Sequence, residues 1–261
     1  MGWHKKMKVA LVTGGLPRFT PDFVKLMNQL KGFESADIYM TLWASDWATS
    51  EDEARAKIEK ILLPQYKLAK ITIVDQPDYE LPLHSITLTP PKNEKYITWW
   101  YKRLYIGSLG LLWAHDLIDK EYDVVVAFRV DVSADRDIDL STYDLSKNQL
   151  VCSNTGHSGF VDYKINDQLV FGTPSSIKLY CDVGSKVKEL VPLADPQWAN
   201  TDIIDGATWT WSRECLIGYY MKQLNIPLVY GNFNVIMNSQ GRSKFTDKHF
   251  HHSIAQDPTE S

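Results

Sequence analysis

The chain has 261 residues, which is long for one domain and short for two, and 44% of them are hydrophobic, enough for one sizeable core. Its formal net charge of −4 provides no general basic field, which argues against a nucleic-acid backbone as the principal partner. We therefore expect one compact α/β unit that carries its functional residues on loops.

Strands and helices alternate in the first part of the chain. Apolar, β-rich runs predict three strands, at residues 8–13, 36–43 and 70–75. Thr20 followed by Pro21 is typical of a helix start, and Gly32 is expected to end that helix. Ser50, followed by three acidic residues, predicts the start of the second helix. Because these strands are apolar on both faces, the order predicts a mostly parallel sheet covered by helices.

The second part of the chain has less regular spacing. Four prolines between Gln76 and Glu94 predict an ordered surface loop. Apolar residues at helical spacing predict a long helix after it, which leads to an apolar strand at 124–130. The remaining elements are short strands near residues 150 and 168, helices near 174 and 213, and a final strand at 226–231.

Two loops are expected at one edge of this sheet. The stretches "TGGLPRF" from Thr13 and "FRVDVSAD" from Phe128 both follow strands, and ligands of open parallel sheets bind beyond the carboxyl ends of the strands. Gly14 and Gly15 permit a close backbone approach to a ligand, and Arg18 suits a phosphate or a base. The alternative is an ordinary strand-to-helix turn with a surface arginine. Neither the dinucleotide G-x-G-x-x-G motif nor the phosphate-loop motif is present.

Concentrated charge follows the apolar strand at 124–130. A carboxylate such as Asp131, at the mouth of a buried strand, needs a cation or hydrogen-bond donors beside it. Asp131 on Mg²⁺ or Mn²⁺ and Arg129 on a phosphate oxygen would together hold a metal-bound diphosphate. The alternative is a structural Arg129–Asp131 pair that closes the strand. The later acidic residues are expected to be solvated turn residues: Asp135, Asp137 and Asp139.

Four stretches together carry a family resemblance: "KVALVTGGLPRF", "YDVVVAFRVDV", "NDQLVFGTPSSI" and "SRECLIGYYMKQLNIPLV". They resemble the WavE-like and viral (chlorella-virus-type) glycosyltransferases of the GT-A fold, from about Lys8 to Val235. The resemblance implies a single-domain, Rossmann-like, mostly parallel mixed sheet flanked by helices. It also implies a nucleotide-binding half at about 7–131 and an acceptor-side half at about 132–261. Where the family has Asp-x-Asp, this chain has Arg129-Val130-Asp131.

The resemblance also assigns roles to single residues. It implies that Thr13, Gly14, Gly15, Arg18, Lys102 and Arg129 bind the donor nucleotide. It implies that the metal is held by Asp131 together with a histidine of the C-terminal tail, His251; the alternative is that the tail is simply a polar chain end. Of the tryptophans, Trp209 or Trp211 is expected to touch the acceptor.

Two carboxylates are candidates for the general base. The resemblance implies that Asp167 presents its carboxylate to a sugar hydroxyl. Glu214 lies in the first turn of a predicted helix, which would orient it and keep it ionised. The alternatives are a turn-forming Asn-Asp pair and a helix-stabilising acid, respectively.

Cysteine usage and the N-terminus indicate a compartment. Cys152, Cys181 and Cys215 are widely spaced and odd in number, which predicts buried free thiols in a reducing compartment. We find no signal peptide pattern and no apolar run long enough to span a bilayer. These observations predict a cytoplasmic protein.

The sequence thus predicts a hexosyl- or pentosyl-transferase that moves a sugar from a UDP- or GDP-sugar to a hydroxyl of a carbohydrate acceptor, such as a glycan or lipopolysaccharide, with Mn²⁺ or Mg²⁺ assistance. One alternative is a non-catalytic module that binds carbohydrate or nucleotide. Another is a metal-dependent phosphohydrolase or nucleotidyltransferase, which would need two or more acids at metal-binding spacing.

Overall fold

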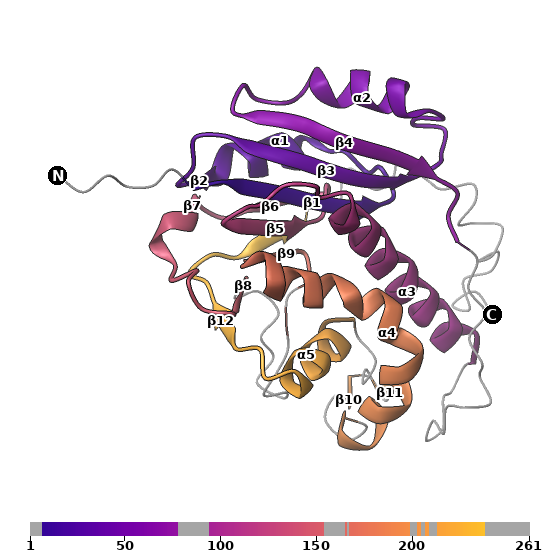
Figure 1. Ribbon diagram of the computed structural model, residues 1–261. Helices are drawn as coiled ribbons and strands as arrows, with labels where there is room; N and C mark the ends of the chain where they lie inside the picture. Colours follow the sequence, from indigo (N-terminus) through magenta and orange to yellow (C-terminus); the bar gives the residue numbers. More distant parts are fainter. Residues whose placement is uncertain are drawn as a thin grey trace.

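The computed structural model describes residues 7–77, 94–153, 165, 167–198, 203–204, 207–208 and 213–237 (Figure 1). Within these ranges, the helical residues 94–104 and 191–198 are described by their backbone. The proline-rich stretch, predicted as an ordered loop, lies outside the description from residue 78 to 93.

A seven-stranded sheet forms the centre of the molecule, in the order β12-β8-β9-β5-β1-β3-β4. The strands, in chain order, are β1 (Val9–Gly15), β3 (Ala36–Trp43), β4 (Tyr66–Val74), β5 (Val124–Phe128), β8 (Leu150–Cys152), β9 (Leu169–Gly172) and β12 (Leu228–Tyr230). Strand β9 is antiparallel to both of its neighbours, and the other adjacent pairs are parallel. The predicted α/β class, with a mostly parallel mixed sheet, is confirmed.

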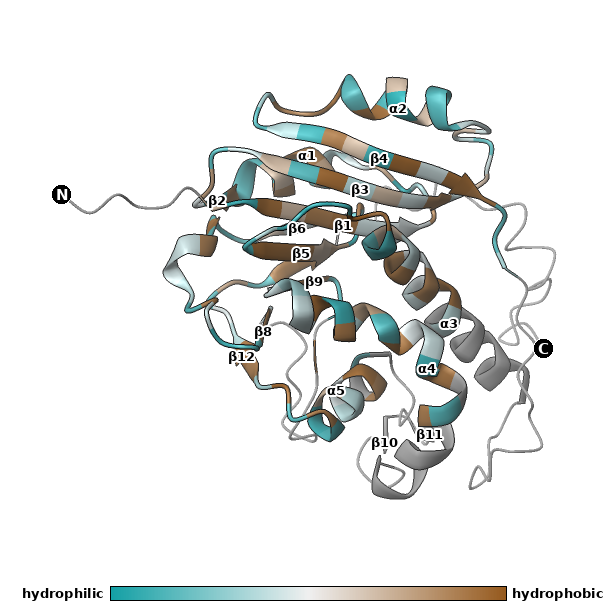
Figure 2. Cartoon of the chain, in the orientation of Figure 1, coloured by the Kyte–Doolittle hydropathy of each residue, from teal (hydrophilic) through white to brown (hydrophobic). Residues whose placement is uncertain are grey.

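Helices cover both faces of the sheet (Figure 1). They are α1 (Pro21–Gln29), α2 (Glu51–Glu59), α3 (Glu94–Asp116), α4 (Pro174–Trp198) and α5 (Arg213–Gln223). Alternating strand residues divide the core: Val9 and Leu11 pack on the side of α1 and α2, whereas Ala10 and Val12 pack on the side of α3, α4 and α5. Figure 2 accordingly shows the hydrophobic colour along the central strands. In the part of the chain that the structure describes, no helix combines the length and apolar character needed to cross a membrane.

The helix starts follow the sequence prediction. The Thr20 hydroxyl accepts a hydrogen bond from the backbone N–H of Asp22, and Pro21 occupies the first turn, where a missing N–H has no cost. The Ser50 hydroxyl accepts from the N–H of Glu53, whose carboxylate accepts in return from the N–H of Thr49. The buried free thiols of Cys152 and Cys181 are also confirmed, while the Cys215 side chain lies outside the description.

Several boundaries differ from the prediction. Helix α1 ends at Gln29 rather than at Gly32, because the chain turns into a short strand, β2 (Leu30–Lys31). Strand β4 begins four residues before the predicted start at residue 70. Strand β12 was predicted to be the last strand, but β13 (Val235–Met237) follows it and pairs antiparallel with β6 (Val132–Ala134).

Gly32 has a different role from the one predicted. Its φ of +89° lies in the left-handed region, and an added Cβ would lie 2.3 Å from Oδ1 of Asp139. This close approach occurs where β2 pairs with β7 (Ile138–Asp139). Gly32 therefore permits a turn after a strand, and it does not cap the helix.

Other short elements were absent from the prediction. They are a 3₁₀ turn (Leu140–Thr142) and a hairpin of β10 (Ile203–Ile204) with β11 (Ala207–Thr208). The Asp139 carboxylate accepts from the N–H and the hydroxyl of Ser141, at 3.0 and 2.6 Å, and so caps the 3₁₀ turn. Such elements of two or three residues are too short to produce a periodic pattern.

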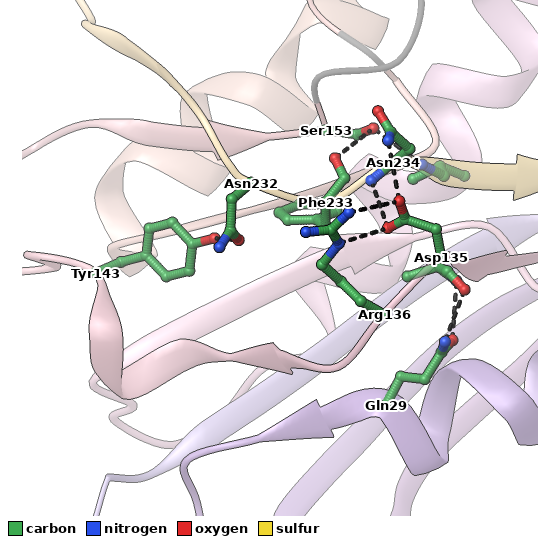
Figure 3. A network of polar contacts seen from close by, with 10 residues as sticks. Gln29, Asp135, Arg136, Tyr143, Ser153, Asn232, Phe233 and Asn234 are labelled. Carbon is green, nitrogen blue, oxygen red and sulfur yellow. Dashed lines mark hydrogen bonds and ion pairs between the residues drawn. The ribbon is translucent and has the colours of Figure 1, made fainter.

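Asp135 stabilises the β6–β13 strand pair through the hydrogen-bond network shown in Figure 3. Its carboxylate accepts hydrogen bonds from the backbone N–H and the side-chain amide of Asn234, at 2.9 and 3.0 Å, and pairs with Arg136. The hydroxyl of Ser153 accepts from the N–H of Val235 on the same segment. Asp135 is therefore a structural acceptor and not the solvated turn residue that was predicted, whereas Asp137 is exposed.

The hydrogen bonds to Asp135, above all that from the backbone of Asn234, hold the pKa of its carboxyl at about 2. A carboxyl with a lowered pKa contributes stability above its ordinary pKa, and the contribution is lost as the pH falls towards about 2. We predict that Asp135→Asn lowers the melting temperature at pH 7 by about 2–4 °C, the shift for about 1 kcal/mol in a domain of this size. Melting scans at pH 7, 5 and 3 should show that the difference in melting temperature between the variant and wild type becomes smaller as the pH falls. The matched control, Asp137→Asn, should melt like wild type throughout; equal effects of the two substitutions would contradict this role.

Candidate functional site

The sheet has a topological switch point between β1 and β5. From β1, the chain proceeds to β3 and β4 on one side, and then β5 adds to the other side of β1. In open parallel sheets, ligands bind in the crevice at the carboxyl ends of the two strands where the order reverses. Here these ends are Gly15 and Phe128, so the loops that follow them share one edge, as the sequence predicted.

The two glycines that end β1 are required by the fold. A Cβ on Gly14 would lie 2.1 Å from the backbone carbonyl of Gly110, so a side chain here would collide with helix α3. Gly15 has a φ of +110°, a conformation that side chains disfavour. The close approach at Gly14 is therefore made by a helix. Ligand contacts from Gly14, Gly15 and the buried Thr13 stay predictions.

The loop after β1 is stabilised by aromatic contacts. The Phe19 ring stacks on Trp47, with 4.9 Å between the ring centroids, and meets Phe23 edge-on at 5.1 Å. The backbone N–H of Arg18 donates to the carbonyl of Leu16 at 2.8 Å. The partly exposed Arg18 thus belongs to an ordered turn at the sheet edge, next to the switch point.

Arg129 and Asp131 form a two-pronged ion pair directly after β5. Nε of Arg129 donates to Oδ1 of Asp131 at 2.9 Å, and Nη2 donates to Oδ2 at 2.7 Å. The Asp131 side chain is 7% exposed and that of Arg129 is 26% exposed. Burial alone would lower the pKa of Arg129, but the attraction of Asp131 and of more distant carboxylates raises it above its ordinary value, so the guanidinium is charged. This geometry is that of the structural pair, the alternative that the sequence left open.

Both candidate bases lie close to this pair. The N–H of Arg129 donates to the carbonyl of Gln168 at 2.9 Å, which brings the neighbouring Asp167 beside the end of β5. The N–H of Ile165 donates to the carbonyl of Glu214 at 3.4 Å, which ties the first turn of α5 to the same loop. Asp167 and Glu214 both interact electrostatically with the Arg129 guanidinium. The fold thus gathers three predicted site residues, all carboxylates, around Arg129.

Tyr180 anchors this cluster from α4. Its hydroxyl donates to the backbone carbonyl of Asp167 at 3.2 Å, and the tyrosine is almost fully buried. Sequence reasoning missed Tyr180, because nothing in a helical run of apolar residues marks which hydroxyl faces a loop. Asp167 itself is only 7% exposed, so its position is determined by packing as well as by hydrogen bonds.

The described residues do not fit the predicted divalent metal. Both oxygens of Asp131 already accept hydrogen bonds from Arg129, and a guanidinium at this distance repels a cation. Within the described ranges, no group of three histidine, cysteine or acidic side chains is placed to hold a metal ion. Mn²⁺ or Mg²⁺ assistance therefore stays a prediction, as does its proposed ligand His251, which lies outside the described residues.

Three further predicted residues also fall outside the description. They are Trp209, Trp211 and, for its side chain, Lys102, whose backbone lies in helix α3. Their predicted contacts with the acceptor and the donor stay predictions.

A cavity of about 530 Å³ lies away from the switch point, beside the amino end of β5 and the start of α4. Charged side chains of both signs line it, including Lys120, Lys178, Asp116 and Glu121. Lys120 is already paired with Asp37, at 3.4 Å. The mixed charge favours no single class of ligand, so the switch point remains the candidate site.

The chain is similar to known proteins at the level of structure. No protein-family model matches the chain, and no curated protein matches it. Among solved structures, it is similar to the crystal structure of the apo-form glycosyltransferase GlyE in Streptococcus pneumoniae TIGR4, with 13% sequence identity and a TM-score of 0.40. The match covers 87% of this chain and 46% of that one, so the chain spans about half the length of that structure. A likeness this distant carries no argument, and the resemblance to WavE-like and viral enzymes stays a prediction.

The ion pair predicts a stability effect at Asp131. We expect Asp131→Asn to destabilise the protein by about 1–3 kcal/mol, because the half-buried Arg129 loses a charged acceptor on both prongs. Denaturant unfolding measures the change. Asp137→Asn, in the exposed turn that follows β6, is the control and should stay within about 0.5 kcal/mol of wild type. An Asp131 variant as stable as the control would show that the pair contributes nothing to folding.

Proposed function

We propose that the protein is a glycosyltransferase that transfers a sugar from a nucleotide-diphosphate sugar to a hydroxyl group of a carbohydrate acceptor. The observation that carries the proposal is the cluster of Arg129, Asp131, Asp167 and Glu214 at the switch point, where an α/β sheet of this topology binds ligands. The donor would be a UDP- or GDP-sugar, the group transferred a hexose or pentose, and the setting the cytoplasm.

The chemistry needs a carboxylate and a site for the nucleotide. The acceptor oxygen forms a bond to the anomeric carbon while the bond from that carbon to the diphosphate breaks, and the acceptor proton passes to a carboxylate. Positive charge develops on the sugar in such reactions, and nearby carboxylates stabilise it. Asp167 and Glu214 supply these carboxylates, and Arg18, at the end of β1, would bind the nucleotide. The assay below compares the reaction with and without Mn²⁺, and the chemistry described here does not require the ion.

Two alternatives are less well supported. A metal-dependent phosphohydrolase or nucleotidyltransferase needs acids spaced for metal, and the described residues hold no such group. A non-catalytic binding module would not need two carboxylates beside one arginine, but it would bind the same ligands. Turnover distinguishes it from a transferase.

The first test is a panel of UDP- and GDP-sugars, with Mn²⁺ or with EDTA, in which release of free nucleotide is measured. We expect selective release with one donor. Arg18→Lys keeps the charge but loses the planar arrangement of N–H donors, so calorimetry should show about tenfold weaker binding of that sugar donor. Arg55→Lys on α2 is the control and should leave this affinity unchanged. If the protein binds a nucleotide sugar but releases no free nucleotide with any acceptor, the binding module is favoured instead. An unchanged affinity for the donor in Arg18→Lys would exclude Arg18 from the donor site.

The second test separates the two candidate bases. General-base assistance is worth about 10²- to 10⁴-fold, so replacing the true base should lower kcat by that order and leave nucleotide binding nearly intact. We expect the larger loss for Asp167→Asn and a smaller one for Glu214→Gln, because Asp167 lies directly beside the end of β5. The measurement is kcat at saturating donor with the acceptor found in the panel. Near wild-type turnover in both variants would contradict the assignment and point to a retaining mechanism or to another base.

A further inference from the structure

Two hydrogen bonds hold the backbone that carries Asp167. The hydroxyl of Tyr180, on α4, donates to the carbonyl of Asp167 at 3.2 Å. The N–H of Arg129, after β5, donates to the next carbonyl along the chain, that of Gln168, at 2.9 Å. Two successive planar peptide units are thereby held, one by a helix and one by the end of a strand. The orientation of the first unit limits the directions in which the Asp167 side chain can leave the backbone.

Of these two bonds, only the one from Tyr180 is made by a side chain. The tyrosine is 2% exposed, and its ring belongs to the same hydrophobic core cluster as Ile165, Val170 and Ile217. A phenylalanine at this position would fill the same space and lack only the hydroxyl. The ring therefore suits the core, whereas the hydroxyl connects the core to the loop that precedes β9.

A general base depends on its exact position. The base must lie within hydrogen-bond reach of the acceptor hydroxyl, about 2.6–3.2 Å, in the reacting complex. Groups on loops are positioned less precisely than groups on helices and strands, unless a second set of contacts supports them. Asp167 precedes β9 on a loop, and Tyr180 connects that loop to helix α4. The hydroxyl thus supplies the kind of support that a base on a loop needs.

We propose that Tyr180 is a positioning residue, which holds Asp167 in place for proton transfer from the acceptor hydroxyl through its hydrogen bond to the Asp167 backbone. This inference rests on the proposed function and adds to it a residue from the core of the fold. Tyr180 acts through Asp167 and does not touch the substrates. Its hydroxyl is therefore expected to affect turnover and not the binding of the sugar donor.

The chain contains a matched control for the loss of this hydroxyl. Tyr66 is also buried, and its hydroxyl also donates to a backbone carbonyl, that of Met27, at 2.6 Å. Tyr66 begins β4, which is parallel to β3, as β3 is to β1. It therefore lies at the edge where these strands start, opposite the edge where Asp167 lies. Tyr66→Phe loses the same kind of hydrogen bond away from the candidate site.

The first test compares the two tyrosine variants at saturating sugar donor, with the acceptor found in the panel. We expect Tyr180→Phe to lower kcat by about tenfold to hundredfold, because a displacement of about 1 Å in a reacting group can cost about 10²-fold. The Kd of the sugar donor, from calorimetry, should stay within about twofold of wild type. Tyr66→Phe should keep kcat within about twofold. A wild-type kcat in Tyr180→Phe, or equal losses of kcat in both variants, would overturn the proposal.

A double-mutant cycle separates positioning from a general loss of structure. If Tyr180 acts through the carboxylate, Tyr180→Phe should change the residual kcat of Asp167→Asn by less than about twofold. A loss of tenfold or more in both backgrounds would show a general structural role and contradict the inference. A loss in Asp167→Asn with none in Tyr180→Phe would contradict the inference alone. Wild-type turnover in Asp167→Asn would remove the base assignment itself, and the inference with it.

Asp167→Glu covers the case in which Tyr180→Phe fails to fold. This substitution keeps the carboxylate but moves it outward by one methylene group. If the position of the base matters, kcat should fall by at least about tenfold while the Kd of the sugar donor stays within about twofold. Near wild-type kcat in Asp167→Glu would overturn the proposal, because a base that tolerates displacement needs no positioning residue. Failure of wild type to release nucleotide from any sugar donor would contradict the proposed function, and the inference with it.

Discussion

The parallel pairing of β1 with β5 is the constraint on which the candidate site depends. Four consecutive residue pairs, from Val9 with Val124 to Val12 with Ala127, align the two strands so that both run to the same edge. The residues that follow these two strands then lie at this edge: the Arg18 turn after one and the Arg129–Asp131 pair after the other. A shift of one residue in this register would turn the buried side chains of β5 to the opposite face.

The site is built from the order of the strands and not from any one motif. Strand β9 runs antiparallel beside β5, so the loop that enters β9 meets the loop that leaves β5, and Asp167 lies near Arg129 although they are far apart in the sequence. Helix α5 joins the same loop through the backbone bond between Ile165 and Glu214. The antiparallel strand thereby brings the second half of the chain to the switch point of the first.

Sequence reasoning predicted local features well and tertiary contacts poorly. The helix starts at Thr20 and Ser50 were predicted correctly because capping depends on neighbours along the chain. The role of Gly14 was not predictable, since the Gly110 backbone that excludes its side chain lies almost a hundred residues away. For the same reason, the sequence left open whether Arg129 and Asp131 form a pair: two side chains after a strand can meet only if the backbone beyond it turns suitably. Charged residues at the edge were foreseeable, but their partners were not.

The ion pair also bears on how the site works before any ligand arrives. A long arginine side chain loses conformational freedom when it binds a ligand, and this loss weakens binding. In this protein the Arg129 side chain is already ordered by folding, because Asp131 accepts hydrogen bonds from two of its nitrogen atoms and is itself buried. A carboxylate that ends a buried strand needs a positive partner, and here that partner is an arginine, which the same two hydrogen bonds hold in one orientation at the sheet edge.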